Sequence, residues 1–126
     1  MDTRPIILHV EDDRSLQNLV RIALEQLGGY RVLTAGSGAR ALELAAGATP
    51  RLLLLDLDLP DMSGLQTLRS LRPLPGFAQI PAVFLTAACG RQVEAELRAA
   101  GVVEVLRKPF RPRELVQAIR RILEGA

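Results

Sequence analysis

The sequence is poor in several residue types, and each shortage argues against a class of structure or function. One cysteine in 126 residues allows no disulfide within the chain and favours a reducing compartment. Aromatic residues make up 3% and the formal net charge is +2, so the sequence offers neither base-stacking platforms nor a strongly basic surface for nucleic acid. No apolar run approaches the length of a membrane span, and the first residues lack a signal-peptide pattern. We therefore expect a cytoplasmic protein with no membrane and no nucleic-acid partner.

The remaining composition is that of a globular domain, with 48% hydrophobic and 24% charged residues. A chain of this length can bury one core and is too short for two ordinary domains, so we expect a single domain over residues 1–126. The basic residues are fifteen arginines and one lysine, Lys108. Because arginine is used everywhere else, the position of this lysine decides whether function or chance retained it.

Apolar strand-like segments alternate with helical ones five times along the chain. The predicted strands cover residues 5–11, 30–35, 52–56, 81–86 and 102–107. The predicted helices are opened by residues 12–15 and stopped by Gly28, then cover 39–46, about 63 to the prolines at 73 and 75, 90–100, and 112–124. Four consecutive leucines before Asp56 are typical of a strand buried on both faces of a parallel sheet. The alternation predicts such a sheet with helices on both faces, and periodicity alone leaves the strand order open.

Polar side chains follow four of the predicted strands, at the carboxyl edge where open α/β sheets bind their ligands. The first strand ends in residues 11–13, the third in Asp56, the fourth in Thr86, and the fifth in Lys108. Clustered carboxylates repel one another and need a cation, and oxygen ligands without histidine or cysteine favour Mg²⁺ over Ca²⁺. Mg²⁺ held by one or two carboxylates is the usual partner of a phosphoryl group. The Thr86 hydroxyl and the Lys108 ammonium would then donate hydrogen bonds to the phosphoryl oxygens. The strand-end position alone leaves open whether Asp56 is a nucleophile, a metal ligand or a helix cap.

Four segments together resemble the receiver domains of two-component response regulators, over essentially the whole chain. They read VEDD at 10–13, LDLDLPDMSG at 55–64, FLTA at 84–87 and KPF at 108–110. Each is weak alone, and their order and spacing make the resemblance specific. It implies a flavodoxin-like (βα)5 fold of the chemotaxis single-domain type, a three-layer sandwich whose parallel five-stranded sheet has the order 2-1-3-4-5.

The same resemblance implies a function and its partners. It implies a signalling domain that gains and loses its own phosphoryl group, rather than a turnover enzyme. The donor would be a sensor histidine kinase or a histidine phosphotransfer protein, and signalling would proceed by contact with a downstream protein that the sequence does not identify.

The resemblance also implies which residues hold the metal. Glu11 and Asp12 would form the acidic pair, with Asp12 the more direct Mg²⁺ ligand, and Asp56 would join them. Asp58 would give its backbone carbonyl to the ion. Asp13, the third acidic residue of its run, is better interpreted as the N-cap of the following helix, because aspartate is a preferred cap.

The phosphoryl group would lie on Asp56, according to the resemblance, and three later residues would contact its oxygens. They are Thr86, Lys108 and Ala87, the last through its backbone N–H. The Lys108-Pro109 bond is expected to be cis, which only a bond before proline adopts at low cost. Taken without the other segments, Thr86 would equally suit a strand through its β-propensity.

Several residues near these motifs receive simpler interpretations. His9, the only histidine, lies in a buried strand and is interpreted as a satisfied core residue. Cys89 shows no acid, base or metal partner and is interpreted as structural, and Asp61 lies in a turn-like loop where aspartate is common. Val105 stands where many receivers carry a tyrosine or phenylalanine. We therefore expect phosphorylation to shift the loop at 86–90 and the next helix rather than to swing a ring.

Two rival functions belong to other classes. The sequence at 55–58 also resembles the Asp-x-Asp motif of haloacid-dehalogenase-like phosphatases, in which Asp56 would be the nucleophile. In those enzymes the motif opens the first core strand and the acidic pair follows the lysine, whereas here the pair precedes Asp56. A pseudo-receiver would bind partners independently of phosphorylation, but such domains have usually lost an acidic residue, the threonine or the lysine. The sequence stops at Ala126 without an effector, as either a stand-alone regulator or a piece of a longer protein.

Overall fold

Five parallel strands form one sheet in the order β2-β1-β3-β4-β5, in a computed structural model that describes residues 2–87 and 90–125. The strands are β1 (Ile6–Val10), β2 (Arg31–Ala35), β3 (Leu52–Asp56), β4 (Ala82–Thr86) and β5 (Val102–Arg107). Each predicted strand agrees with the observed one to within one residue at either end. The strand order confirms the flavodoxin-like topology that the resemblance implied.

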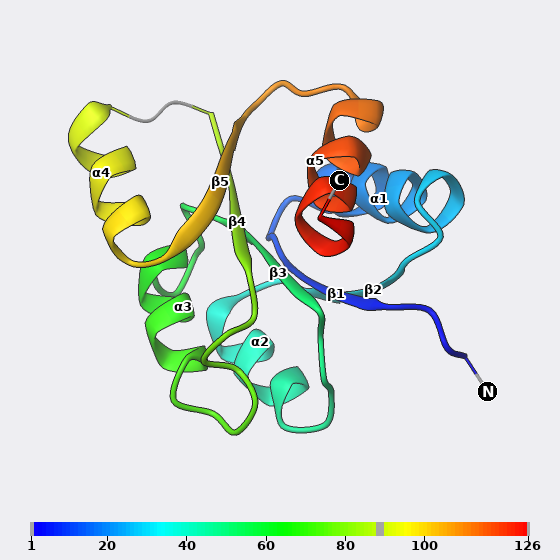
Figure 1. Cartoon of the computed structure of the whole chain (residues 1–126). Coiled ribbons are helices and arrows are strands. Elements are labelled where there is room, and N and C mark those ends of the chain that lie inside the picture. Colours follow the sequence, from blue (N-terminus) through cyan, green and yellow to red (C-terminus); the bar gives the residue numbers. More distant parts are fainter. Residues whose placement is uncertain (1, 88–89, 126) are drawn as a thin grey trace.

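Helices cover both faces of this sheet, so the molecule has three layers (Figure 1). The helices are α1 (Arg14–Ile22), the π-helical turn η1 (Ala23–Leu27), α2 (Gly38–Ala45), α3 (Gly64–Leu71), α4 (Arg91–Ala99) and α5 (Pro112–Glu124). Helices α1 and α5 lie on one face of the sheet, and α2, α3 and α4 lie on the other (Figure 1). A search of the described helices finds none with the length and apolar character of a membrane span.

The four leucines of β3 divide between two hydrophobic cores, as side chains that alternate across a strand must. Leu53 and Leu55 pack with residues of α2, α3 and α4, whereas Leu52 and Leu54 pack with residues of α1 and α5. All four side chains are fully buried. The central strand is therefore packed on both faces, and this packing fixes the position of Asp56 at its end.

The helical spacing of apolar residues in the first helix predicts a stripe that faces the sheet, made of Leu16, Leu19, Val20, Ala23, Leu24 and Leu27, and this prediction is only partly correct. Val20, Ala23 and Leu24 are buried against the sheet, but Leu19 and Leu27 are 41% and 54% exposed. The N–H of Gly28 bonds to the carbonyl of Ala23, which closes a wide π turn. Because this turn changes the helical period, Leu27 does not follow Leu24 onto the sheet. Leu19 does not enter the core and instead lines a pocket on the surface.

A similar correction applies to the predicted fourth helix. Helical spacing predicts that Val93, Leu97 and Ala100 face inward, but Val93 is 36% exposed, and Leu97 is the residue of α4 that enters the core. Helix α4 therefore contributes one buried side chain, that of Leu97, to the core.

His9 is a core residue, as predicted, but it is not a satisfied one. Its side chain is fully buried in β1, and neither ring nitrogen has a hydrogen-bond partner among the described residues. Burial lowers the pKa of His9 to about 3, and the positive charges of Lys108 and Arg21 act in the same direction. The imidazole is therefore neutral in the folded protein at ordinary pH.

His9 should make the protein sensitive to acid. The pKa of His9 is 6.5 in the unfolded chain, the ordinary value for histidine, and about 3 in the folded chain, so the unfolded state binds more protons between these values. Stability contributed by the neutral imidazole is thus present above pH 6.5 and is lost as pH falls, by about 2 kcal/mol between about pH 7 and pH 5. Urea denaturation at several pH values should show this loss in wild type and not in His9→Leu. Parallel pH profiles for the two proteins would contradict the assignment.

Candidate functional site

The parallel register brings four strand ends to one edge of the sheet. Val10 of β1 lies opposite Leu55 of β3, and Asp56 lies opposite Leu85 of β4. The N–H of Lys108 donates to the Thr86 carbonyl at 2.8 Å and continues the pairing of β4 with β5. The side chains that the sequence predicted to meet here therefore do lie at the same edge.

Three carboxylates gather at this edge, from Glu11, Asp12 and Asp56. Each offers an oxygen, and these oxygens all lie within 4.8 Å of one another. Glu11 and Asp56 are buried, whereas Asp12 is exposed. The oxygen-only donor set with an open side is compatible with the Mg²⁺ site of a receiver domain.

Glu11 is harder to ionise in this cluster than in water, mainly because its carboxyl group is buried. The pKa of Glu11 is raised to about 7, chiefly by burial, and the nearby charge of Asp56 contributes to this rise. A hydrogen bond from the Asp13 N–H and the charge of Lys108 oppose the rise without cancelling it. A bound cation would favour the ionised form of Glu11, because an opposite charge nearby lowers the pKa of a carboxyl group.

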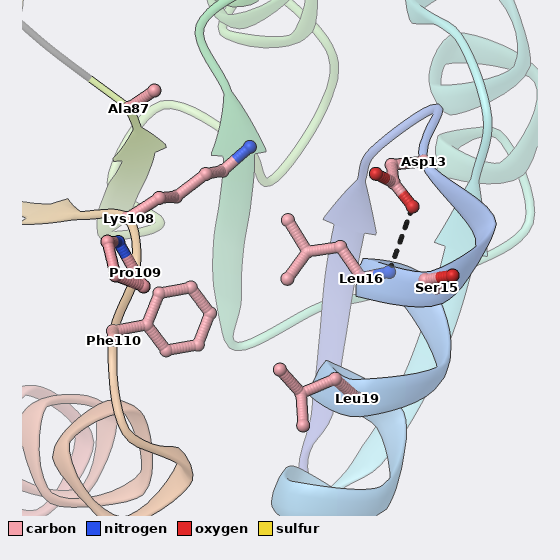
Figure 2. A pocket seen from close by; sticks show the side chains of 8 residues that line it. All are labelled: Asp13, Ser15, Leu16, Leu19, Ala87, Lys108, Pro109 and Phe110. Atoms are coloured by element: carbon pink, nitrogen blue, oxygen red, sulfur yellow. Dashed lines mark hydrogen bonds between the residues drawn. The ribbon is translucent and has the colours of Figure 1, made fainter.

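The only lysine of the chain lies between two of these carboxylates. The Nζ atom of Lys108 is 3.3 Å from Oε1 of Glu11 and 3.4 Å from Oδ1 of Asp56. Its side chain extends toward the carboxyl end of β3 (Figure 2). The Lys108-Pro109 peptide bond is cis, as expected. The position of Lys108 thus favours a functional reason for its presence over chance.

The acidic run at the end of β1 separates into different environments. Asp13 is the N-cap of α1, and its carboxylate accepts a hydrogen bond from the N–H of Leu16 at 3.2 Å (Figure 2). This confirms the predicted cap. The Asp13 N–H donates to Oε2 of Glu11 at 3.1 Å, so the start of the helix also orients the buried carboxylate.

The loop that follows β3 packs against the backbone of Asp56. The N–H of Gly64 donates to the Leu57 carbonyl at 2.7 Å, and Asp58 pairs with Ser63 in an isolated bridge. A Cβ atom at Gly64 would collide with the carbonyl oxygen of Asp56, so this position needs glycine. The Asp58 side chain is exposed, while its N–H lies 3.4 Å from Oδ1 of Asp56.

Asp61 has a more specific environment than its interpretation as a turn residue suggested. Its two carboxylate oxygens accept hydrogen bonds from the N–H groups of Gly38 and Ala39, at 3.0 and 2.9 Å. These bonds lower the pKa of Asp61. No local pattern predicts this contact, because the donors lie more than twenty residues earlier in the sequence.

Thr86 is buried at the end of β4, and Ala87 after it is exposed. Cys89, which was interpreted as structural, and part of the loop at 86–90 lie outside the described residues. Val105 of β5 is half-buried beside Phe84 and packs against the core beneath α2, α3 and α4.

A largely apolar pocket of about 530 Å³ opens beside Lys108. The ring of Phe110 faces Leu16 and Leu19 of α1 across it (Figure 2). It is lined by Asp13, Ser15, Leu16, Leu19, Ala87, Lys108, Pro109 and Phe110. Helical spacing predicts that Leu16 and Leu19 face the sheet, and Leu16 does pack against the core. Their position opposite Phe110 could not be predicted from the sequence, because only the fold brings α1 beside the segment after β5.

Comparison with known proteins gives a family match over most of the chain. A model described as the response regulator receiver domain matches residues 7–120. Transcriptional regulatory protein CpxR of Escherichia coli is 41% identical over 118 residues, which are 93% of this chain and 48% of that protein. Transcriptional regulatory protein KdpE of Mycobacterium tuberculosis is 35% identical over 115 residues, 91% of this chain and 49% of that protein. The chain thus spans about half the length of these two relatives.

Solved structures show the same similarity. Chemotaxis protein CheY4 of Vibrio cholerae superposes with a TM-score of 0.91 at 29% identity, covering 96% of this chain and all of that one (100%). The non-phosphorylated HemR receiver domain of Leptospira biflexa has a TM-score of 0.86 at 32% identity, covering 95% and 94%. Both fold and family are therefore shared over nearly the whole length.

Proposed function

The chain belongs to the response regulator receiver family, and from this premise we propose that Asp56 accepts a phosphoryl group in a two-component phosphorelay. One observation carries the proposal. Asp56 ends a strand in which every residue is buried, with the Lys108 ammonium 3.4 Å from its Oδ1 atom and the carboxylates of Glu11 and Asp12 beside it. A carboxylate in such a place is fixed in orientation and flanked by a cation that can bind an incoming anion.

In the proposed reaction an oxygen of Asp56 attacks the phosphorus of a phosphohistidine. A phosphorus–oxygen bond forms, the phosphorus–nitrogen bond breaks, and the imidazole leaves with the electron pair and takes a proton from solvent. Lys108 stabilises the negative charge on the phosphoryl oxygens, as does the backbone N–H of Ala87. The Thr86 hydroxyl, at the end of the neighbouring strand, donates to a further phosphoryl oxygen.

The residues that would hold Mg²⁺ are the carboxylates of Glu11, Asp12 and Asp56 together with the backbone carbonyl of Asp58. The three carboxylates already form a group of suitable size, and Asp58 lies in the loop that packs on Asp56. When bound, the ion would neutralise this group and polarise the phosphoryl oxygens.

The proposed donor is a sensor histidine kinase or a histidine phosphotransfer protein. A macromolecular donor has to bring its histidine to the open edge beside Lys108, where the pocket lined by Leu16, Leu19 and Phe110 offers an apolar contact (Figure 2). One relative, at 37% identity over 112 residues, is itself named a sensor histidine kinase, TmoS of Ectopseudomonas mendocina. We propose that the phosphorylated domain, spanning residues 1–126, signals by contact with a downstream protein.

Phosphorylation should be confined to Asp56. Incubation with acetyl phosphate and Mg²⁺ should add the mass of one phosphoryl group to wild type and none to Asp56→Asn, because the amide is not a competent nucleophile. Asp58→Asn is the matched control and should still form the adduct, since only its backbone carbonyl is needed. Intact-mass spectrometry measures all three proteins.

Each alternative outcome has a meaning. An adduct that persists in Asp56→Asn would contradict the assignment of the acceptor. No adduct in wild type would favour a pseudo-receiver, and continuous turnover of a small phosphomonoester would favour a phosphatase.

Two neighbouring aspartates should differ in their effect on metal binding. Asp12→Ala removes a proposed ligand and should weaken Mg²⁺ binding by about tenfold or more, at least the usual cost of losing an outer-sphere partner. Asp13→Ala removes the cap of α1 and should cost about 1 kcal/mol of unfolding free energy while leaving metal affinity nearly unchanged. Calorimetric titration with Mg²⁺ and urea denaturation separate the two effects. Equal losses of Mg²⁺ affinity in the two variants would contradict the assignment of Asp12, rather than Asp13, as the metal ligand.

A further inference from the structure

Asp61 ties the loop after β3 to the start of α2. Its carboxylate accepts hydrogen bonds from Gly38 N–H and Ala39 N–H, while the Ser37 hydroxyl accepts one from Arg40 N–H at 3.1 Å. The first amides of a helix have no partner within it, so Asp61 and Ser37 together satisfy three groups that the helix leaves open. The negative charge also lies at the favourable end of the helix dipole.

Packing holds the same loop against α2 independently of these hydrogen bonds. A Cβ atom added to Gly38 would lie 2.6 Å from the Sδ atom of Met62 and 2.6 Å from the Oγ1 atom of Thr67. The Thr67 hydroxyl in turn donates to the Ser63 carbonyl at 3.1 Å. The loop therefore touches the first residue of α2 with no space for a larger side chain.

The other end of this loop is fixed to the site. Gly64 N–H bonds to the Leu57 carbonyl, and Asp58 pairs with Ser63. Residues 57–63 are thus held near Asp56 at one end and at α2 by Asp61 at the other. The Asp58 carbonyl, which the proposed function assigns to Mg²⁺, lies between the two attachments.

From this arrangement we infer that Asp61 is a positioning residue for the metal site. It touches neither the proposed ion nor the phosphoryl group. It fixes the loop that carries the Asp58 carbonyl, and its own carboxylate is bound by two N–H groups at the start of α2. This inference rests on the proposed function for the identity of the ion.

The test compares variants at the two capping positions of the same helix. Asp61→Ala should weaken Mg²⁺ binding by about tenfold, within the usual cost of losing an outer partner of a metal ligand. Asp61→Asn should lose less, because its side-chain oxygen retains one acceptor. Ser37→Ala is the matched control: it should lower the urea midpoint as a lost cap does but leave the Mg²⁺ affinity unchanged.

Calorimetric titration with Mg²⁺ decides between positioning and plain destabilisation. Wild-type affinity in Asp61→Ala would overturn the inference, and so would an equal loss of affinity in Asp61→Ala and Ser37→Ala. A larger loss confined to the Asp61 variants would support it.

A second measurement separates this inference from the proposed function. Amide hydrogen exchange of Gly64, read by NMR without metal, should speed up in Asp61→Ala and stay unchanged in Ser37→Ala. A wild-type chain that binds no Mg²⁺ would overturn the proposed metal site, and the Gly64 exchange rates would still decide whether Asp61 holds the loop. Unchanged exchange in Asp61→Ala would show that it does not.

Discussion

Two buried carboxylates and one ammonium set the main constraint on this structure. Glu11 and Asp56 are brought together by the parallel register of β1 and β3, and Lys108 reaches both from beyond β5. Removing charges from water is costly unless they are paired, and one positive charge does not balance the three carboxylates at this edge. Burial is the main cause of the raised pKa of Glu11, and the charge of Asp56 adds to it. A divalent cation and a phosphoryl group together would change this balance of charge, which supports the phosphoryl transfer that we propose.

The rest of the fold holds these groups in place. The leucines of β3 enter both cores, so the strand that carries Asp56 cannot shift without disturbing either side of the sheet. The following loop fits closely because Gly64 leaves space for the Asp56 carbonyl and Gly38 leaves space for Met62. Sites supported by rigid strands and closely packed neighbours keep their geometry better than sites carried on free loops.

Much of this could be predicted from the sequence because strand periodicity and turn residues act locally. The bounds of β5 and α5 and the strand-end position of Asp56 followed from pattern alone, whereas the strand order required the family resemblance. The misses all depend on tertiary contacts. The pattern showed that His9 is buried but not that its ring nitrogens find no hydrogen-bond partner among the described residues. It also did not show the π turn that exposes Leu27 or the helix whose N–H groups bind Asp61.

The single lysine permits a direct test of the proposal that Lys108 binds the phosphoryl group carried by Asp56. Lysine labelled with ¹³C gives one set of side-chain signals, because the chain contains no other lysine. Addition of Mg²⁺ and beryllofluoride, which mimics a phosphoryl group, should shift the Cε resonance in wild type as the ammonium leaves Glu11 for the new anion. The same addition should leave Asp56→Asn unchanged. A wild-type lysine signal that does not respond would contradict the account.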